Sequence, residues 1–151
     1  MPNALVDRLW PVLGPLMGQH ARIYRVTGGR IGHRFPGLPP FLVLEHVGAK
    51  SGKRRTTPLL YVEDGKDYVV IASKGGHPRH PSWYHNLRAN PDVTIQVGAQ
   101  RMPARARVAN AEERPRLWRR AVQVYRSYDD YQRRTDREIP VVILETRKAS
   151  A

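Results

Sequence analysis

Between residues 41 and 73 the chain consists of short apolar runs separated by residues that favour turns. The first run, 41–47, is rich in branched and aromatic side chains, which suit a strand. A second run, 55–63, follows a short basic stretch, and Asp64-Gly65 is a common hairpin turn that leads into a third run, 67–73. Runs at hairpin spacing indicate antiparallel strands, so they restrict the fold to one built mainly from β-structure.

The second half of the chain adds strands and inserts helices among them. Three further strands are expected, at 92–97, 100–109 and 139–144. Three helices are expected, at 82–89, 110–126 and 127–134. Pro103 marks an edge position or a bulge, and Asn110 and Glu113 resemble a helix-capping pair. A Rossmann sheet is disfavoured because strands and helices do not alternate and no G-x-G-x-x-G follows a strand. About six strands with late helices predict an antiparallel barrel with helical decoration.

The 151 residues suit a single domain with a helical segment ahead of it. Apolar residues of the segment 1–24 fall near a helical period, which Pro11 and Pro15 interrupt. This segment is expected either to pack on the core or to form an amphipathic surface helix that touches lipid or closes a pocket. We therefore divide the chain into residues 1–24, a barrel domain at 25–147 and a loose tail at 148–151.

The charge balance constrains the ligand. Twenty-six Lys and Arg residues face 13 Asp and Glu residues, a formal net charge of +13. Such a charge favours nucleic acids, anionic membranes or small polyanions without distinguishing them. The absence of cysteine excludes disulfides and thiolate metal sites, and it fits a reducing cytoplasm. No apolar segment reaches about eighteen residues, and no signal peptide is expected. We expect a cytoplasmic protein and leave attachment to a membrane surface open.

The cations are most concentrated in residues 48–58, the basic stretch, which contains four cations and no acidic residue. Glycines, hydroxyls and cations in this arrangement suit an anionic group. A Walker A loop is excluded because Gly52-Lys53 is followed by Arg54. Nucleic-acid binding is disfavoured because aromatic residues are not interleaved with the cations. Phosphate binding is favoured, and a solvated basic loop remains the alternative.

Two other segments carry features of a site. In the run from Ala72 to Gly76, two glycines permit positive φ and close approach of the backbone to a planar ligand, although an ordinary turn explains them equally well. Tyrosines recur at spacing three at positions 125, 128 and 131, which fits core packing and a pocket wall about equally. A metal site is not expected, because His80 and His85 do not share a helical face. No G-x-S-x-G hydrolase motif is present.

Taken together in order and spacing, these motifs resemble the deazaflavin-dependent nitroreductase family of actinobacteria. These are split-barrel proteins that use reduced coenzyme F420. The resemblance covers nearly the whole chain and begins at residues 24–30. It continues through 48–58, 72–76, 80–87, 90–91, 131–137 and 139–142. It implies an α+β, mainly β fold, an FMN-binding-like split β-barrel of about six antiparallel strands with peripheral helices.

The resemblance also implies roles for individual residues. The cofactor-binding residues it implies are Lys50, Ser51, Arg54, Arg55, Thr56, Thr57, Pro58, Ala72, Ser73, Lys74, Gly75, Trp83, Tyr84, Asn86 and Leu87. The catalytic hydroxyls it implies are those of Ser73, Tyr125, Tyr128 and Tyr131, which would stabilise charge on the acceptor. Tyr61 is expected to extend the acceptor wall. Coenzyme F420 carries a phosphodiester and a poly-glutamate tail, so a strongly basic protein suits it.

The implied activity is hydride transfer from reduced F420 to a quinone or to a nitroaromatic or nitroimidazole acceptor. Two alternatives stay open at this point: an FMN-binding split-barrel oxidoreductase, and a non-catalytic F420 carrier. The expected partners are small-molecule acceptors, with no nucleic acid. A homodimer and peripheral membrane contact through residues 1–24 are left open.

Overall fold

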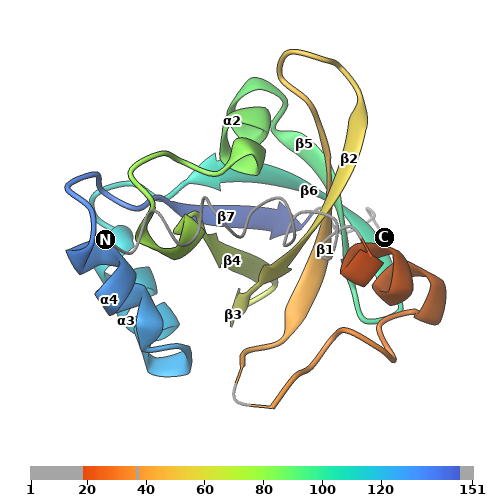
Figure 1. Ribbon diagram of the computed structural model, residues 1–151, viewed down its shortest axis with the longest axis horizontal. Helices are drawn as coiled ribbons and strands as arrows, with labels where there is room; N and C mark the ends of the chain where they lie inside the picture. The colour runs from red at the N-terminus through yellow and green to blue at the C-terminus, as the bar shows by residue number, and fades with distance from the viewer. Residues whose placement is uncertain (1–18, 37, 147–151) are drawn as a thin grey trace.

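The computed structural model describes residues 19–36 and 38–146, and its centre is one antiparallel sheet (Figure 1). Seven strands lie in the order β2-β1-β5-β6-β7-β4-β3, and every neighbouring pair is antiparallel. The strands are β1 (Phe41–Val47), β2 (Arg54–Leu60), β3 (Val62–Asp64), β4 (Asp67–Ile71), β5 (Asp92–Val97), β6 (Gln100–Val108) and β7 (Val141–Thr146). The mainly β, antiparallel architecture expected from the sequence is confirmed.

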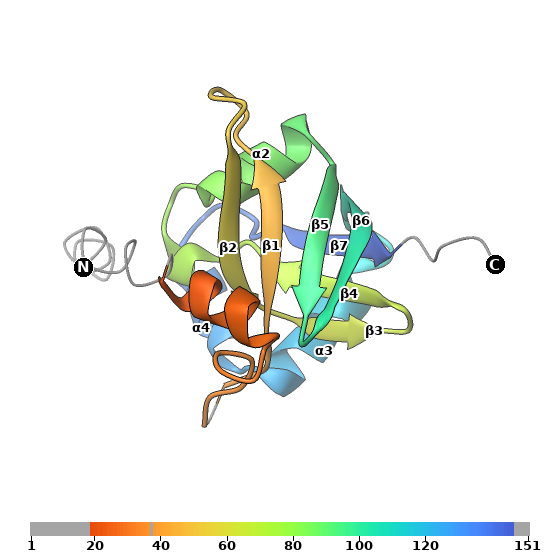
Figure 2. The same ribbon diagram turned by 90° about the vertical axis from the view of Figure 1, so that its right-hand side faces the viewer.

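One residue closes the sheet into a barrel. Strands β2 and β3 stand at opposite ends of the hydrogen-bonded order, yet only Tyr61 separates them in the chain. Consecutive Cα atoms are about 3.8 Å apart, so the two outer edges must meet there and the sheet must curl (Figure 2). The prediction of a single strand at 55–63 is therefore wrong in detail. Its two halves pair with different partners, β1 and β4.

Alternation along the strands separates an inner core from an outer one. Leu42, Leu44, Ile95 and Leu144 are fully buried inside the barrel. Strands β4 and β7 are buried on both faces, so they read as continuous apolar runs. Pro103 lies in a part of β6 that pairs only with β5, so its missing N–H costs no bond to β7.

Helices cover the outer faces. Helices α3 (Arg114–Val124) and α4 (Ser127–Arg133) pack on the outer side of β4 and β7 through a cluster that includes Leu117, Tyr128 and Ile143. Residues 19–27 form a helical segment on the other side of the sheet, where Tyr24 packs on Val43 (Figure 1). Helix α2 (Ser82–Ala89) and the 3-10 helix η1 (Lys74–Gly76) lie between β4 and β5 in sequence.

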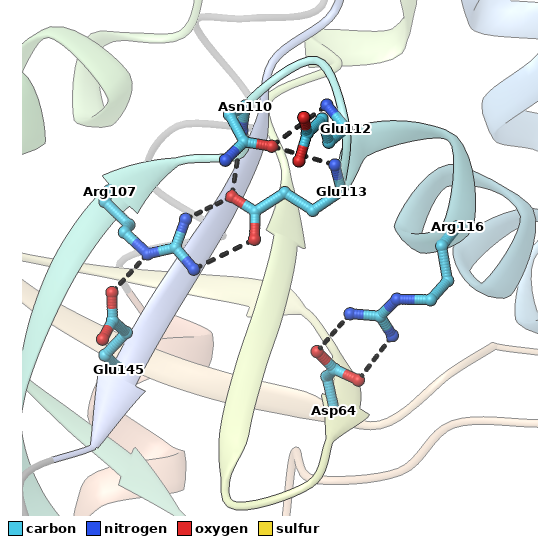
Figure 3. Close-up of polar contacts among 7 residues, drawn as sticks. All are labelled: Asp64, Arg107, Asn110, Glu112, Glu113, Arg116 and Glu145. Atoms are coloured by element: carbon cyan, nitrogen blue, oxygen red, sulfur yellow. Dashed lines mark hydrogen bonds and ion pairs between the residues drawn. The ribbon is translucent and has the colours of Figure 1, made fainter.

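The start of α3 is fixed by the predicted capping pair (Figure 3). The side chain of Asn110 accepts hydrogen bonds from the N–H groups of Glu112 and Glu113, and the carboxylate of Glu113 accepts from the N–H of Asn110. The guanidinium of Arg107 on β6 also contacts Glu113 and Glu145. These contacts hold α3, and the α4 that follows it, at one place on the sheet.

Most expected elements agree with the structure within one to three residues. Strand β4 ends at Ile71, so Ala72 and Ser73 belong to the loop that follows, and α3 begins at Arg114 after a turn. The helix expected at 1–24 lies largely outside the described residues, and its described part runs on to residue 27. The expected tail, 148–151, lies outside them as well. Within residues 19–36 and 38–146, no helix has the length and apolar character to cross a membrane.

Candidate functional site

A cleft of about 530 Å³ runs along β2 to η1, the start of α2 and the α3–α4 junction. This volume lies within the range of small-molecule sites. The residues around it are Phe41, His46, Arg55, Thr56, Thr57, Pro58, Leu59, Leu60, Ile71, Ser73, Lys74, Gly75, Pro81, Ser82, Trp83, Tyr125, Tyr128 and Tyr131. The cleft therefore brings the end of the basic stretch, the glycine turn and the three tyrosines to one place.

Strand β2 forms one wall of the cleft, and its alternation sends neighbouring residues of the basic stretch to opposite faces. Neighbouring residues of a strand project to opposite faces, and the pairing sets His46 opposite Arg55 and Leu44 opposite Thr57. Arg55 and Thr57 thus lie on the face of the barrel interior and line the cleft. Arg54 projects the other way and does not line the cleft. It borders a second, polar groove of about 550 Å³ beside β1, β2 and β5, which Arg55 and Thr56 border as well.

A chain of hydrogen bonds supports this wall from within. The N–H of Ala49 donates to Asn86 Oδ1 at 2.9 Å, and Asn86 Nδ2 lies 3.0 Å from His46 Nδ1. His46 Nε2 in turn lies 2.9 Å from Thr57 Oγ1. Because Asn86 Nδ2 can only donate, His46 carries its proton on Nε2 and donates it to Thr57. Thr57 is then free to donate its own O–H into the cleft.

His46 is neutral in this setting. Its side chain is buried, and burial, reinforced by the charge of Arg55, lowers its pKa to about 4. A protonated ring would present N–H to the amide N–H of Asn86, so the hydrogen-bonded chain requires the neutral form.

The cations of the basic stretch have no acidic partner among the described residues. Carboxylates elsewhere pair with arginines, as Glu45 does with Arg101 and Asp64 with Arg116. In the part of the chain that the structure describes, no ion pair neutralises Lys50, Arg54 or Arg55. The basic stretch thus leaves its charge available to an anionic ligand.

The turn after β4 has an unusual backbone. Lys74, Gly75 and Gly76 have φ values of 45°, 62° and 81°, all in the left-handed region. For lysine this conformation is uncommon and costs energy. Ser73, Lys74 and Gly75 line the cleft, and at glycine a ligand can approach the backbone closely. The backbone of this turn therefore differs from that of an ordinary glycine turn.

The three tyrosines serve both as core and as wall. Tyr128 is buried against the outer core, and all three rings line the cleft. The hydroxyls of Tyr125 and Tyr131 lie 3.2 Å apart. Burial raises the pKa of Tyr128, and burial with the Tyr125 hydrogen bond raises the pKa of Tyr131 to about 12. These two hydroxyls therefore stay protonated at neutral pH and can donate hydrogen bonds.

Several expected residues lie outside the cleft lining. Lys50 and Ser51 are exposed at the tip of the β1–β2 hairpin, where Ser51 Oγ accepts a hydrogen bond from the N–H of Lys53 (Figure 2). Asn86 is buried behind the wall. The remaining expected residues outside the lining are Arg54, Ala72, Tyr84, Leu87 and Tyr61, of which all but Arg54 are buried.

His46 is the main lining residue that the sequence reasoning missed. The alternation of 41–47 places it on the same face as Leu42 and Leu44, and a polar residue in that position beside a basic loop is an available signal. The other lining residues that were not expected are Phe41, Leu59, Leu60, Ile71, Pro81 and Ser82.

The donors around the cleft fit a flat, anionic cofactor. Arg55 and Lys74 supply positive charge, Thr57 supplies a hydroxyl and Gly75 an open backbone. Fold and site together define a split-barrel oxidoreductase of the FMN-binding-like type. The chain belongs to the F420H2-dependent quinone reductase family, whose sequence model matches residues 16–146. Reduced coenzyme F420 is the cofactor on which this family depends.

Individual relatives agree with this family assignment. The chain is 50% identical to an F420H2-dependent quinone reductase of Mycobacterium tuberculosis over 135 residues, which are 87% of this chain and 91% of that protein. It is 48% identical to a solved F420-H2 dependent reductase, with a TM-score of 0.66, covering 70% of this chain and 94% of the other. A solved domain-swapped dimer is 44% identical, with a TM-score of 0.67, and covers 84% of this chain and 94% of the other.

Proposed function

We propose that this protein transfers a hydride from reduced coenzyme F420 to a quinone. The observation that carries the proposal is the composition of one cleft, which is lined both by the cationic side chains of Arg55 and Lys74 and by protonated tyrosine hydroxyls. A homodimer, the assembly of one structural relative, is the oligomeric state we propose.

The cofactor end is assigned to β2 and η1. Arg55 and Lys74 would hold the anionic groups through charge-assisted hydrogen bonds, and Thr57 would donate its hydroxyl. The open backbone at Gly75 and the indole of Trp83 suit the faces of a planar ring. When bound, reduced F420 supplies the hydride. Lys50, Ser51 and Arg54 are assigned to the outer part of the cofactor, since they lie beyond the cleft.

The acceptor end is assigned to the tyrosines. A quinone that accepts a hydride gains negative charge on oxygen, and the hydroxyls of Tyr125, Tyr128 and Tyr131 can donate hydrogen bonds to it. Ser73 also lines the cleft and offers a further hydroxyl. The apolar faces of the tyrosine rings exclude water and stack on a flat acceptor. No residue needs to act as a covalent nucleophile.

The proposal is tested by the absorbance of oxidised F420 that appears when reduced F420 and menadione are mixed with the protein. We expect turnover with quinones, and a Tyr131→Phe variant should retain cofactor affinity while its turnover falls about 10-fold. Absence of turnover across a panel of quinones and nitro compounds, despite tight F420 binding, would make the protein a carrier. Tight binding of FMN instead of F420 would favour the flavin alternative. Turnover with nitro compounds would extend the proposed acceptors to that class.

We also propose peripheral contact of the N-terminal part with an anionic membrane, which is where quinones dissolve. Exposed apolar side chains support it: Val26 is 80% exposed and Ile31 is 59% exposed, with Arg22 and Arg30 beside them. We expect the protein to sediment with vesicles containing anionic lipid and a Val26→Asp, Ile31→Asp variant to sediment less. Equal sedimentation of both proteins would remove these residues from the contact.

A further inference from the structure

Arg137 makes four polar contacts with the loop around η1. Its Nε donates to the carbonyl of His77 at 2.7 Å, and its Nη2 donates to the carbonyl of Ser73 at 2.8 Å. Its Nη1 lies 3.2 Å from the carbonyl of Ala72 and 3.0 Å from His80 Nδ1. One guanidinium thus binds carbonyls on both sides of the left-handed turn 74–76, from behind the surface that lines the cleft.

The backbone of Arg137 is in turn tied to α4. Gln132, near the end of that helix, donates to the carbonyl of Arg137 and accepts from the N–H of Ile139. The turn also packs closely on α4, because a Cβ at Gly76 would lie 2.7 Å from the carbonyl oxygen of Tyr131. Helix α4 carries Tyr128 and Tyr131. The glycine turn and the tyrosine wall are therefore joined through the loop that contains Arg137.

We propose that Arg137 is a positioning residue, whose guanidinium holds the 72–77 turn against the loop after α4 and thereby fixes the spacing between the cofactor side and the acceptor side of the cleft. This inference rests on the proposed function. Hydride transfer depends steeply on how the two reactants are placed, and a displacement of about 1 Å can cost about 100-fold in rate. Arg137 itself is not among the residues that line the cleft.

The chemistry of this position requires arginine. The planar fork of a guanidinium reaches several carbonyls at once, whereas the ammonium group of lysine is a point charge that satisfies fewer of them. Without the guanidinium, the carbonyls of Ala72 and His77 lose the donor that Arg137 provides, and the carbonyl of Ser73 keeps only the N–H of Gly76. The turn, in which Lys74 holds an unfavourable φ of 45°, is then held less firmly and can relax.

The test compares Arg137→Lys with Arg133→Lys, a matched control whose arginine pairs with Asp130 on the exposed side of α4. The first readout needs no cofactor: hydrogen–deuterium exchange of the amides of residues 73–77. We expect exchange in this segment to rise about 10-fold or more in Arg137→Lys and to stay unchanged in the control. The second readout is kinetic. The turnover number of Arg137→Lys should fall about 10- to 100-fold, while the dissociation constant for F420 changes less than about threefold.

Rescue separates positioning from general damage. An Arg137→Ala variant should regain part of its turnover in millimolar guanidinium but not in equal methylammonium, and Arg137→Gln replaces it if alanine prevents folding. Unchanged exchange at 73–77, or equal loss of turnover and F420 affinity without rescue, would overturn the proposal. Absence of quinone turnover in the unmodified protein would instead overturn the proposed function. Hydrogen–deuterium exchange at residues 73–77 would still test whether Arg137 holds the turn.

Discussion

Replacing Arg55 with alanine is expected to raise the dissociation constant for reduced F420 about 10- to 100-fold. Arg55 lines the cleft and has no acidic partner among the described residues, so its charge is available to the cofactor. A hydrogen bond to a charged group contributes about 1.5–3 kcal/mol, which corresponds to this range. Arg54→Ala should change the dissociation constant less than about fivefold, because the Arg54 side chain lies on the other face of β2.

The two variants form a matched pair, since they remove the same side chain from neighbouring positions of one strand. The measurement is a titration of each protein with reduced F420 at two ionic strengths. The Arg55 effect should shrink as salt is added, because a charge contact with the cofactor is screened. Equal losses in the two variants would indicate that β2 binds the cofactor with both faces, and no loss in either would remove the basic stretch from the site.

The strands and most helix boundaries could be predicted because their signals are local. Alternation defines β1, and the Asp64-Gly65 turn and the Asn110–Glu113 cap are each contained in a few residues. The division at Tyr61 could not be predicted in this way. The apolar pattern runs through it without interruption, and only the change of pairing partner, from β1 to β4, separates β2 from β3.

The candidate site was predicted as a set of motifs, but a motif does not distinguish the residues within it. Arg54 and Arg55 are adjacent residues with the same chemistry, and only strand pairing shows that Arg55 lines the cleft whereas Arg54 does not. Both arginines border the second, polar groove. Asn86 was expected in the cofactor cleft, and it lies behind the wall because Ala49 and His46 hold it there. A motif does not show which of its side chains contact the ligand and which lie in a second layer behind them.

Arg137 belongs to the 131–137 segment of the family resemblance, but that segment gave no signal of its role. Its partners in the turn lie 57 to 65 positions earlier in the chain. Nothing in the spacing of a basic residue in a loop indicates that it binds backbone carbonyls so far away. The residues that arrange the site are thus harder to find from sequence than the residues that form its surface.

The second large effect is expected in the pH dependence of stability, and it comes from His46. The pKa of His46 is about 4 in the folded protein and about 6.5 in the unfolded chain. Between these values the unfolded chain takes up a proton that the folded protein does not, so the free energy of unfolding falls as the pH falls. From pH 7 to pH 4.5 the contribution of His46 should be a loss of about 2–3 kcal/mol.

The measurement is urea unfolding of the unmodified protein and of His46→Asn at several pH values. The stability difference between them should shrink by about 2–3 kcal/mol as the pH falls from 7 to 4.5. His33 and His80, whose pKa values are also lowered, are present in both proteins and cancel in this comparison. A pH-independent difference would contradict a buried, neutral His46.

Asn86→Asp offers the sharper control, because it inverts the sign of the effect. The carboxylate created by this change can still accept from the N–H of Ala49, but it accepts from a protonated His46 Nδ1 instead of donating to a neutral one. The pKa of His46 should then rise, and His46 would add stability at low pH that is lost as the pH rises through the raised pKa. If Asn86→Asp kept the acid sensitivity of the unmodified protein, the hydrogen-bonded chain from Ala49 to Thr57 would not be what keeps His46 neutral.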